Sequence, residues 1–395
     1  MDSLLEGVRI LDLTRVLAGP YASMVLADLG AEVIKVELPS SGDESRGFGP
    51  FQNGESAYFT SVNRGKKSVT IDLRQERGRD LALGLAERCD VLVENFRPGS
   101  MDRFGLGYET VHAKYPQLVY ASISGFGQTG PYAQRPAYDV LIQAMGGLAS
   151  ITGEPNSPPV RVGSSIADLS AALFGAVGIL AALQRASRTG EGQQIDISML
   201  DCQVALLENA LARYAVSGEV PQPLGSRHPA ITPFQFFAVS DGHIVLAAGN
   251  DGLWRKLCTA LDLLDLIEDS RFADNALRTE NHAALEPLLA EVLADKTVAE
   301  WCEVLVQAGV PSGPLCDVGE VFNDEQIAAR EMIVEIDHPI AGRQAMPNSP
   351  LKFSQTPIQL QRPAPLLGQH TEEVLRDMLD LGTDEITGLR ADGVI

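Results

Sequence analysis

Short β-rich runs alternate with helical patterns through the first third of this 395-residue chain, and this alternation limits the possible folds more than any other feature. Helices are expected in "YASMVLADLG", closed by Gly30, and at about residues 76–88 and 100–114. Strands separated by helices form βαβ units, so the pattern predicts an α/β fold with a mostly parallel sheet covered on both faces. The expected strands are GVRILDL, AEVIKVEL, SVTIDL, DVLVEN and LVYASIS.

The rest of the chain predicts a second, smaller domain, because 395 residues exceed one ordinary core. "RASRTGEGQQIDISML" holds a polar turn and a strand, a helix is expected at about 200–217, and residues 218–233 hold four prolines and two glycines, as a linker does. "FQFFAVSDGHIVLAAG" predicts a hairpin that turns at Asp241-Gly242, followed by helices to about 325. Strand-like residues and a helix at about 371–380 end the chain.

Charge and composition exclude several classes of protein. The formal net charge of −21 opposes association with nucleic acid or anionic lipid, which need a wide positive surface. The apolar run from Leu169 to Leu183 is shorter than the about 20 residues of a membrane-spanning helix, so a buried core helix is expected. Acids replace the basic region of a signal peptide, which predicts a cytoplasmic protein. Scattered cysteines and histidines predict neither disulfides nor a metal site.

Asp168 stands directly before that apolar run and has two interpretations. Asp is a favoured N-cap residue, so it could simply begin the helix. A helix N-terminus also favours the ionised form of a carboxylate, and an exposed carboxylate can attack an activated acyl group. The two roles are compatible only where the carboxylate faces a cleft.

The stretch "GFGQTG" at 125–130 matches the pattern of a dinucleotide-binding loop directly after an expected strand. Pro131 and Pro136 follow it, and no acid lies about 20 residues further on to hold a ribose. A glycine-rich loop is therefore favoured over a dinucleotide site.

The stretch "NRGKKS" at 63–68 is the densest basic cluster of this acidic chain. It is either a solvated face or, with Arg74, Arg97 and Arg103 at the same edge of the sheet, a site for phosphate groups.

Six stretches of the sequence, taken together, point to one family: GVRILDLTRVLAGPYASMVLADLGAEVIKVE, ENFRPGSMDRFGLGY, ASISGFGQTGPYAQRPAYD, ADLSAALFGAVGILAAL, TGEGQQIDISMLD and APLLGQHTEEVL. They occur in the same order as in the class III CoA-transferases, the family that includes formyl-CoA transferase and carnitine CoA-transferase, and the chain resembles this family from about residue 5 to its C-terminus.

The resemblance implies a Rossmann-like large domain at 1–200, a crossing segment at 201–224 and a small α+β domain at 225–325. Residues 326–395 return to the large domain, which 330–395 complete. Two such chains are expected to interlock as linked rings in a homodimer.

The resemblance also implies a mechanism in which the family's catalytic aspartate matches Asp168. This residue would attack the donor acyl-CoA to form a mixed anhydride, and the returning CoA would convert the anhydride to an aspartyl-CoA thioester that the acceptor carboxylate attacks. Acyl-CoA is thus a substrate, no permanently bound cofactor is expected, and the apolar helix would shield the intermediates from water.

Positions that bind CoA in the family can be carried over to this chain. Val16, Leu17 and Ala18 are expected at the thiol end of CoA, while the adenine and phosphates are expected at Ile71, Asp72, Leu73, Arg74, Asn95, Phe96, Arg97 and Arg103. Leu38 and Pro136 stand where family members can carry basic residues. Phosphate contacts are therefore expected to shift to Lys66, Lys67 or Arg97.

Tyr138 and Asp139 of "PAYDV" are also expected at the acyl-CoA site, and they bear on the main alternative. The α-methylacyl-CoA racemases resemble this family, but they place a histidine before the matching aspartate. A tyrosine with a pKa near 10 is a poor base for an α-proton at neutral pH, so Tyr138 favours transfer over racemisation. An NAD-dependent oxidoreductase and a noncatalytic acyl-CoA-binding protein are the alternatives from other classes.

The acceptor acid is predicted from "GSRHPAITP", where Arg227 and His228 lie in the crossing region. A guanidinium binds a carboxylate through two hydrogen bonds. Arg227 is therefore expected to hold the distal carboxylate of a short dicarboxylate such as itaconate, mesaconate or glutarate, with succinyl-CoA as donor. The alternative is that Arg227 pairs with an acid at a subunit interface.

Overall fold

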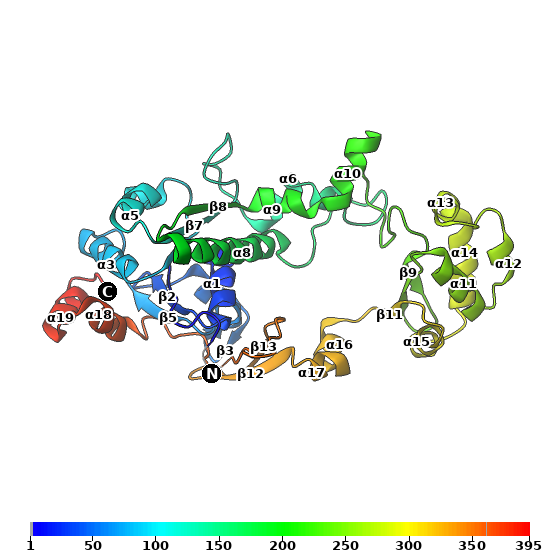
Figure 1. Cartoon of the computed structure of the whole chain (residues 1–395). Coiled ribbons are helices and arrows are strands. Elements are labelled where there is room, and N and C mark those ends of the chain that lie inside the picture. Colours follow the sequence, from blue (N-terminus) through cyan, green and yellow to red (C-terminus); the bar gives the residue numbers. More distant parts are fainter. Residues whose placement is uncertain (1–2, 361) are drawn as a thin grey trace. The chain divides into compact units, whose positions relative to one another are not determined.

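The computed structural model describes residues 3–360 and 362–395 and divides into two compact units (Figure 1). The first unit comprises the chain up to Leu148, Arg161–Leu211 and Ala328–Ile395, and the second comprises Ala149–Val160 and Ala212–Ile327. The division assigns residues 149–160 to the second unit, whereas the sequence placed them in the large domain. The predicted domain boundaries stay a prediction.

Within the described residues, the first unit contains a six-stranded sheet in the order β5-β2-β1-β6-β7-β8. Every neighbouring pair is parallel, and Ile10 of β1 stands between Val33 of β2 and Val91 of β6. This is the strand order of the Rossmann fold, so the prediction of an α/β fold with a parallel sheet is confirmed. The strands are β1 (Arg9–Asp12), β2 (Glu32–Glu37), β5 (Lys67–Thr70), β6 (Val91–Glu94), β7 (Val119–Ser124) and β8 (Gln194–Ser198).

Helices cover both faces of the sheet, because successive strand residues point to opposite sides. Ile10 belongs to a core with α1 (Ala18–Asp28) and α8 (Ile166–Thr189), and Leu11 belongs to the opposite core with α3 (Glu76–Glu87), α18 (Thr371–Leu379) and α19 (Thr383–Ala391) (Figure 1). Further elements of this unit are η1 (Glu44–Gly47), α2 (Ala57–Asn63), α6 (Asp139–Met145), and the hairpins β3 (Phe51–Gln52) with β4 (Glu55–Ser56) and β12 (Ile333–His338) with β13 (Gly342–Pro347).

Two expected helices are each divided in two. The stretch expected at 100–114 forms α4 (Ser100–Arg103) and α5 (Tyr108–Lys114), because Gly105 has a positive φ of 68°. The stretch expected at 200–217 forms α9 (Met199–Leu206) and α10 (Glu208–Ser217), which part where Glu208 has a φ of 39°.

The second unit contains an antiparallel sheet in the order β11-β10-β9 within its described residues. The hairpin of β9 (Phe234–Ala238) and β10 (His243–Ala247) turns across Asp241-Gly242 as predicted, and its core contains Trp254 and Trp301. The other elements are α7 (Leu148–Ile151), α11 (Asp251–Ala260), α12 (Asp265–Glu268), α13 (Asn275–Glu280), α14 (His282–Leu293), α15 (Val298–Gln307), β11 (Ser312–Pro314), α16 (Val318–Asn323) and α17 (Glu325–Ala329), of which α7 and α17 cross the unit boundaries.

Over residues 3–360 and 362–395, α8 is the one helix that is long and apolar enough to cross a membrane. On its buried side, a Cβ atom at Gly175 would lie 3.3 Å from Ile123 of β7 and 3.9 Å from Ala22 of α1. Phe174 and Val177 on its other side are 48% and 63% exposed. The expectation of a buried core helix therefore holds for one face of α8 only.

A close backbone approach in α3 allows a test of the packing. A Cβ atom at Gly78 would stand 2.2 Å from the carbonyl oxygen of Asp72, whereas a Cβ atom at Gly388 of α19 would meet nothing within 4 Å. Gly78→Ala should lower the free energy of unfolding by about 1–3 kcal/mol, since the backbone must shift. Gly388→Ala should raise it by about 0.5–1 kcal/mol. Urea denaturation of both variants checks this prediction, and equal effects would contradict it.

Candidate active site

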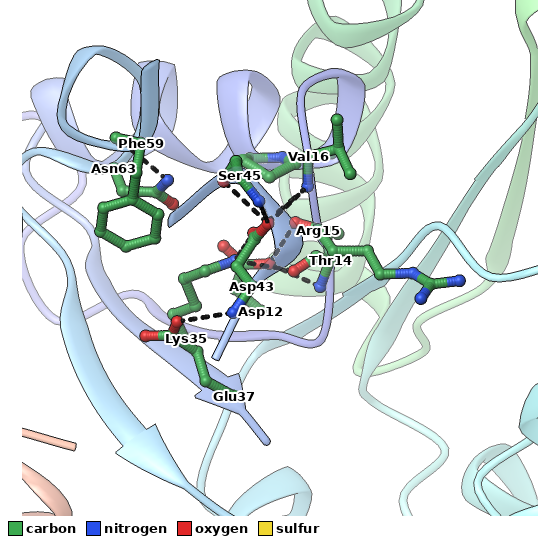
Figure 2. Close-up of polar contacts among 12 residues, drawn as sticks. Asp12, Thr14, Arg15, Val16, Lys35, Glu37, Asp43, Ser45, Phe59 and Asn63 are labelled. Carbon is green, nitrogen blue, oxygen red and sulfur yellow. Dashed lines mark hydrogen bonds and ion pairs between the residues drawn. The ribbon is translucent and has the colours of Figure 1, made fainter. Parts of the chain in front are cut away.

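A buried network of charges lies at the carboxyl ends of β1 and β2 (Figure 2). It consists, among the described residues, of three ion pairs: Asp12 with Lys66 at 3.0 Å, Asp43 with Lys35 at 2.8 Å, and Glu37 with Arg46 at 2.7 Å. Ser68 of β5 adds a 2.6 Å hydrogen bond to Glu37. Each acid of the network is thus matched by one base.

Opposite charges keep these acids ionised. Burial alone would raise the pKa of Asp12, but Lys66 and Lys35 hold that pKa well below its usual range. Burial also opposes ionisation of Asp43 and Glu37, and Lys35 and Arg46 are among the groups that lower the pKa values of these two acids. Burial lowers the pKa of Lys66 to about 8, against the attraction of Asp12. Ionised groups are stable in this interior only because they are paired.

The network fixes the loop that joins β1 to α1. The Lys35 ammonium donates to the carbonyl oxygen of Thr14 at 2.7 Å, and the Val16 amide donates to the Asp43 carboxylate at 3.1 Å (Figure 2). The side chain of Asn95 accepts from the amide of Arg15 at 2.9 Å and donates to its carbonyl oxygen at 2.8 Å. Val16 is held with a φ of 67°, a conformation that β-branched residues rarely adopt.

A cavity of about 290 Å³ opens beside this loop, at the carboxyl ends of β1, β2 and β5. Ligands of open parallel sheets bind at this edge, next to the point where the strand order reverses, which here lies between β1 and β6. The cavity brings together five of the predicted CoA residues: Ile71, Asp72, Leu73, Arg74 and Phe96.

Cationic and aromatic groups surround the same cavity. The Arg15 guanidinium lies 5.0 Å from the centre of the Phe96 ring, and Phe104 meets Phe96 edge to face at 6.0 Å. Arg74 pairs with Asp72 through two hydrogen bonds of 2.8 and 2.9 Å and is 68% exposed. Leu38 lines the cavity as well. Arg15 was missed at the sequence level, where "TRVLAGP" drew attention only to the three residues after it.

The two lysines expected to take over the phosphate contacts are not placed to do so. Lys66 is fully buried and already donates to Asp12, to the carbonyl oxygen of Pro20 and to Asn63 at 2.9–3.0 Å. Lys67 begins β5 and pairs with Glu32 and Glu373, so it lies at the amino end of the sheet. The expectation that Lys66 or Lys67 contacts the CoA phosphates is therefore not supported by their positions.

Other predicted residues lie outside that cavity. Leu17 precedes α1, and Ala18 is its buried first residue. Arg97 is exposed after β6, and Arg103 donates to the hydroxyl of Ser100 at 2.9 Å. Their contacts with CoA remain predictions.

Asp168 is the third residue of α8, which begins at Ile166, so the prediction that it caps the helix is wrong. The helix begins two residues before Asp168, and Ser165 occupies the N-cap position without a side-chain cap bond. Within the part of the chain that the structure describes, no group donates a hydrogen bond to the Asp168 carboxylate. This carboxylate is half-buried.

The surroundings of Asp168 favour its protonated form. Burial, and after it the charge of Asp139, raise the pKa of Asp168 to about 7. The start of a helix favours a negative charge, but desolvation outweighs that effect here. Tyr58 of α2 lies in the same field, since burial and then Asp168, Asp43 and Asp139 raise the pKa of its hydroxyl. Nothing in the sequence around Tyr58 pointed to this position.

Two neighbouring predictions concern Tyr138 and "GFGQTG". Tyr138 directly precedes α6 and is 77% exposed, while Asp139 is buried.

No helix begins after the glycine-rich loop until Asp139, and the amide of Gln128 in that loop donates to Asp196. The loop interpretation is thus the correct one, and the oxidoreductase alternative loses its only support.

Arg227 and His228 belong to the second unit. The Nε atom of Arg227 is buried and has no hydrogen-bond partner among the described residues. Nδ1 of His228 accepts a hydrogen bond from the amide of Ala230 at 3.1 Å.

A Rossmann-type sheet with a cavity at its carboxyl edge and a half-buried carboxylate in the first turn of a core helix is an arrangement typical of α/β enzymes that bind nucleotide-like ligands. Residues 5–371 match the family model described as CoA-transferase family III. The chain is 42% identical over 392 residues to succinyl-CoA:glutarate CoA-transferase of Mus musculus, covering 99% of this chain and 90% of that protein. It is 43% identical over 366 residues to acetyl-CoA:oxalate CoA-transferase of Acetobacter aceti, covering 92% and 93%.

The fold is shared with the crystal structure of a CAIB/BAIF family protein from Brucella suis, with a TM-score of 0.85 and 41% identity over 96% of this chain and all of that one. The chain therefore belongs to CoA-transferase family III, and the resemblance seen in the sequence is confirmed. It is an acyl-CoA:carboxylate CoA-transferase.

The two adjacent lysines allow a test of the buried network. Lys66→Met should destabilise the fold by about 3–5 kcal/mol at pH 7, because Asp12 loses its buried partner. The deficit should shrink toward pH 4, because the unpaired Asp12 of the variant gains a proton in this range while Asp12 of the wild type stays ionised. Lys67→Met removes only surface pairs and should cost about 1 kcal/mol or less. Chemical denaturation across this pH range measures both, and equal losses would refute the assignment.

Proposed function

We propose that this enzyme transfers CoA from succinyl-CoA to a short dicarboxylic acid through covalent intermediates on Asp168. The observation that carries the proposal is the Asp168 carboxylate itself, which is half-buried in the first turn of α8 and has no hydrogen-bond donor among the described residues. The names of the mouse and Acetobacter relatives support a dicarboxylate acceptor, because glutarate and oxalate both carry two carboxylates.

Each step exchanges one nucleophile for another at an acyl carbon. An oxygen of Asp168 attacks the thioester carbon of succinyl-CoA, the carbon–sulfur bond breaks, and CoA leaves as thiolate. The thiolate attacks the aspartyl carbon of the mixed anhydride, which forms the aspartyl-CoA thioester and releases succinate. The acceptor carboxylate then attacks this thioester, and the freed thiolate attacks the acceptor's acyl carbon and restores Asp168. No proton is gained or lost, so the cycle requires Asp168 to begin ionised.

The cavity at the carboxyl edge of the sheet is proposed to receive the nucleotide part of CoA. The edge-to-face pair of Phe96 and Phe104 offers an apolar surface to the adenine, and Arg15 and Arg74 offer guanidinium groups to phosphates. Arg97 and Arg103 remain candidates for the same phosphates. The loop from Val16 to Ala18 is proposed to face the thiol end.

We further propose the interlocked homodimer that the sequence suggested. Leu173, Phe174 and Val177 form an exposed apolar stripe on α8, and Val140 and Met145 are exposed on α6. Such a stripe is stable in water when a second subunit covers it.

Asp168→Asn should reduce turnover by roughly 10³-fold or more, because an amide cannot form the anhydride. The variant should fold and be at least as stable as the wild type at pH 8, where the wild type holds a buried charge. Asp201 occupies the first turn of α9 and is exposed, so Asp201→Asn is a matched control that should retain activity. Steady-state rates with succinyl-CoA and glutarate measure the difference. Substantial turnover by folded Asp168→Asn would exclude the mechanism.

Arg227 is proposed to hold the distal carboxylate of the acceptor, with His228 beside it. The Nε atom of Arg227 is buried and has no hydrogen-bond partner among the described residues, which supports a role of this guanidinium in binding a ligand. Arg227→Met should raise KM for glutarate about tenfold or more and leave KM for a monocarboxylate nearly unchanged. Arg213 also has a buried, unpartnered Nε, so Arg213→Met controls for the loss of a guanidinium. A similar loss with both acceptors would contradict this assignment.

A further inference from the structure

Two side chains of α6 contact the segment that leads into α8. Asp139 and Gln143 lie one helical turn apart and are both buried. The Ala167 amide donates to one carboxylate oxygen of Asp139 at 2.9 Å, and Gln143 Nε2 donates to the other oxygen at 2.8 Å. The amide of Val162 donates to Gln143 Oε1 at 2.8 Å.

We propose that Asp139 and Gln143, here called the α6 brace, are positioning residues that hold the first turn of α8 and with it the Asp168 carboxylate. This inference rests on the proposed role of Asp168 as nucleophile. It replaces the expectation that Asp139 contacts CoA directly.

The α6 brace supplies a hydrogen-bond acceptor for the start of α8 that the residues directly before the helix do not. The first amides of a helix lack partners within the helix, and Ser165 at the N-cap of α8 accepts none of them through its side chain. Asp139 provides the missing acceptor from another helix, directly at the residue before Asp168. Gln143 Nε2 also lies 3.4 Å from the carbonyl oxygen of Ser164, so the brace contacts three residues of the segment before Asp168. A buried network with its donors and acceptors satisfied is rigid.

The position of Asp139 beside the start of α8 also affects the pKa of Asp168. Among the described residues, Asp139 on α6 and Tyr58 on α2 are the titratable groups that interact electrostatically with Asp168. After burial, the charge of Asp139 is what raises the pKa of Asp168. The brace therefore places Asp168 accurately and also raises the pH at which this carboxylate becomes a nucleophile.

Infrared difference titration tests the electrostatic part without turnover. Spectra of the wild type minus Asp168→Asn report the protonated carboxyl of Asp168, which should titrate near pH 7. Asp139→Asn keeps an acceptor oxygen for the Ala167 amide but removes the charge. Its titration midpoint, measured against the double variant with Asp168→Asn, should fall by about half to one pH unit. An unchanged midpoint would overturn this part of the proposal.

Kinetics test the positioning part. Gln143→Met preserves side-chain volume but removes the hydrogen bonds, and it should lower kcat about tenfold or more while KM for succinyl-CoA changes less than twofold. Gln203 is a matched control, because it is fully buried on α9 and its amide atoms have no hydrogen-bond partner among the described residues. Gln203→Met should retain wild-type kcat. Equal losses in these two variants, with equal thermal stability, would show that Gln143 acts only through general packing.

The role of Asp168 as nucleophile and the role of the α6 brace can be disproved separately. Full activity of Asp168→Asn would exclude Asp168 as nucleophile and with it the proposed function, whereas the infrared midpoint would still report whether Asp139 controls this carboxylate. A dead Asp168→Asn combined with an unshifted midpoint and an unimpaired Gln143→Met would retain the nucleophile and exclude the brace.

Discussion

The ion-pair network of Asp12, Lys35, Glu37, Asp43, Lys66 and Arg46 is the interaction on which the architecture of the site depends. Each of these charges would cost several kcal/mol if buried alone, so the network is stable only as a complete set. Because its members come from β1, β2, the segment after β2 and the turn before β5, pairing the charges also fixes these segments relative to one another. Val16 is held in its unfavourable backbone conformation by the same carboxylate that neutralises Lys35.

The sheet was predictable because its strands are apolar runs bounded by polar residues, and runs of this kind are typical of strands buried on both faces. The helix division at Gly105 could have been expected, because glycine readily adopts a positive φ, whereas nothing in the sequence marks the φ of 39° at Glu208. Lys35 could have been recognised as unusual. It stands inside "EVIKVE", a strand with no exposed face, where a charge needs a buried partner.

Much of the site was located through the resemblance, and local chemistry alone would have misplaced parts of it. "NRGKKS" is basic, yet the sequence does not reveal that Lys66 points inward or that Lys67 lies at the amino end of its strand. Five of the predicted CoA residues follow β5 or β6 and line one cavity, because the carboxyl ends of parallel strands share one edge, and their contacts with CoA stay predictions. The brace was not predictable, because Gln143 and Val162 become neighbours only in the fold.

Burial, which the apolar composition of α8 favours, is the larger of the two causes that raise the pKa of Asp168. A mixed anhydride and a thioester are both hydrolysed by water, so a useful covalent intermediate requires a dry surrounding. The same desolvation that would protect the proposed intermediates disfavours the ionised carboxylate that the proposed mechanism requires, and the pKa of about 7 reflects that conflict. Rigid placement by the α6 brace offsets part of the loss, because a well-oriented carboxylate reacts efficiently even when only about half of it is ionised.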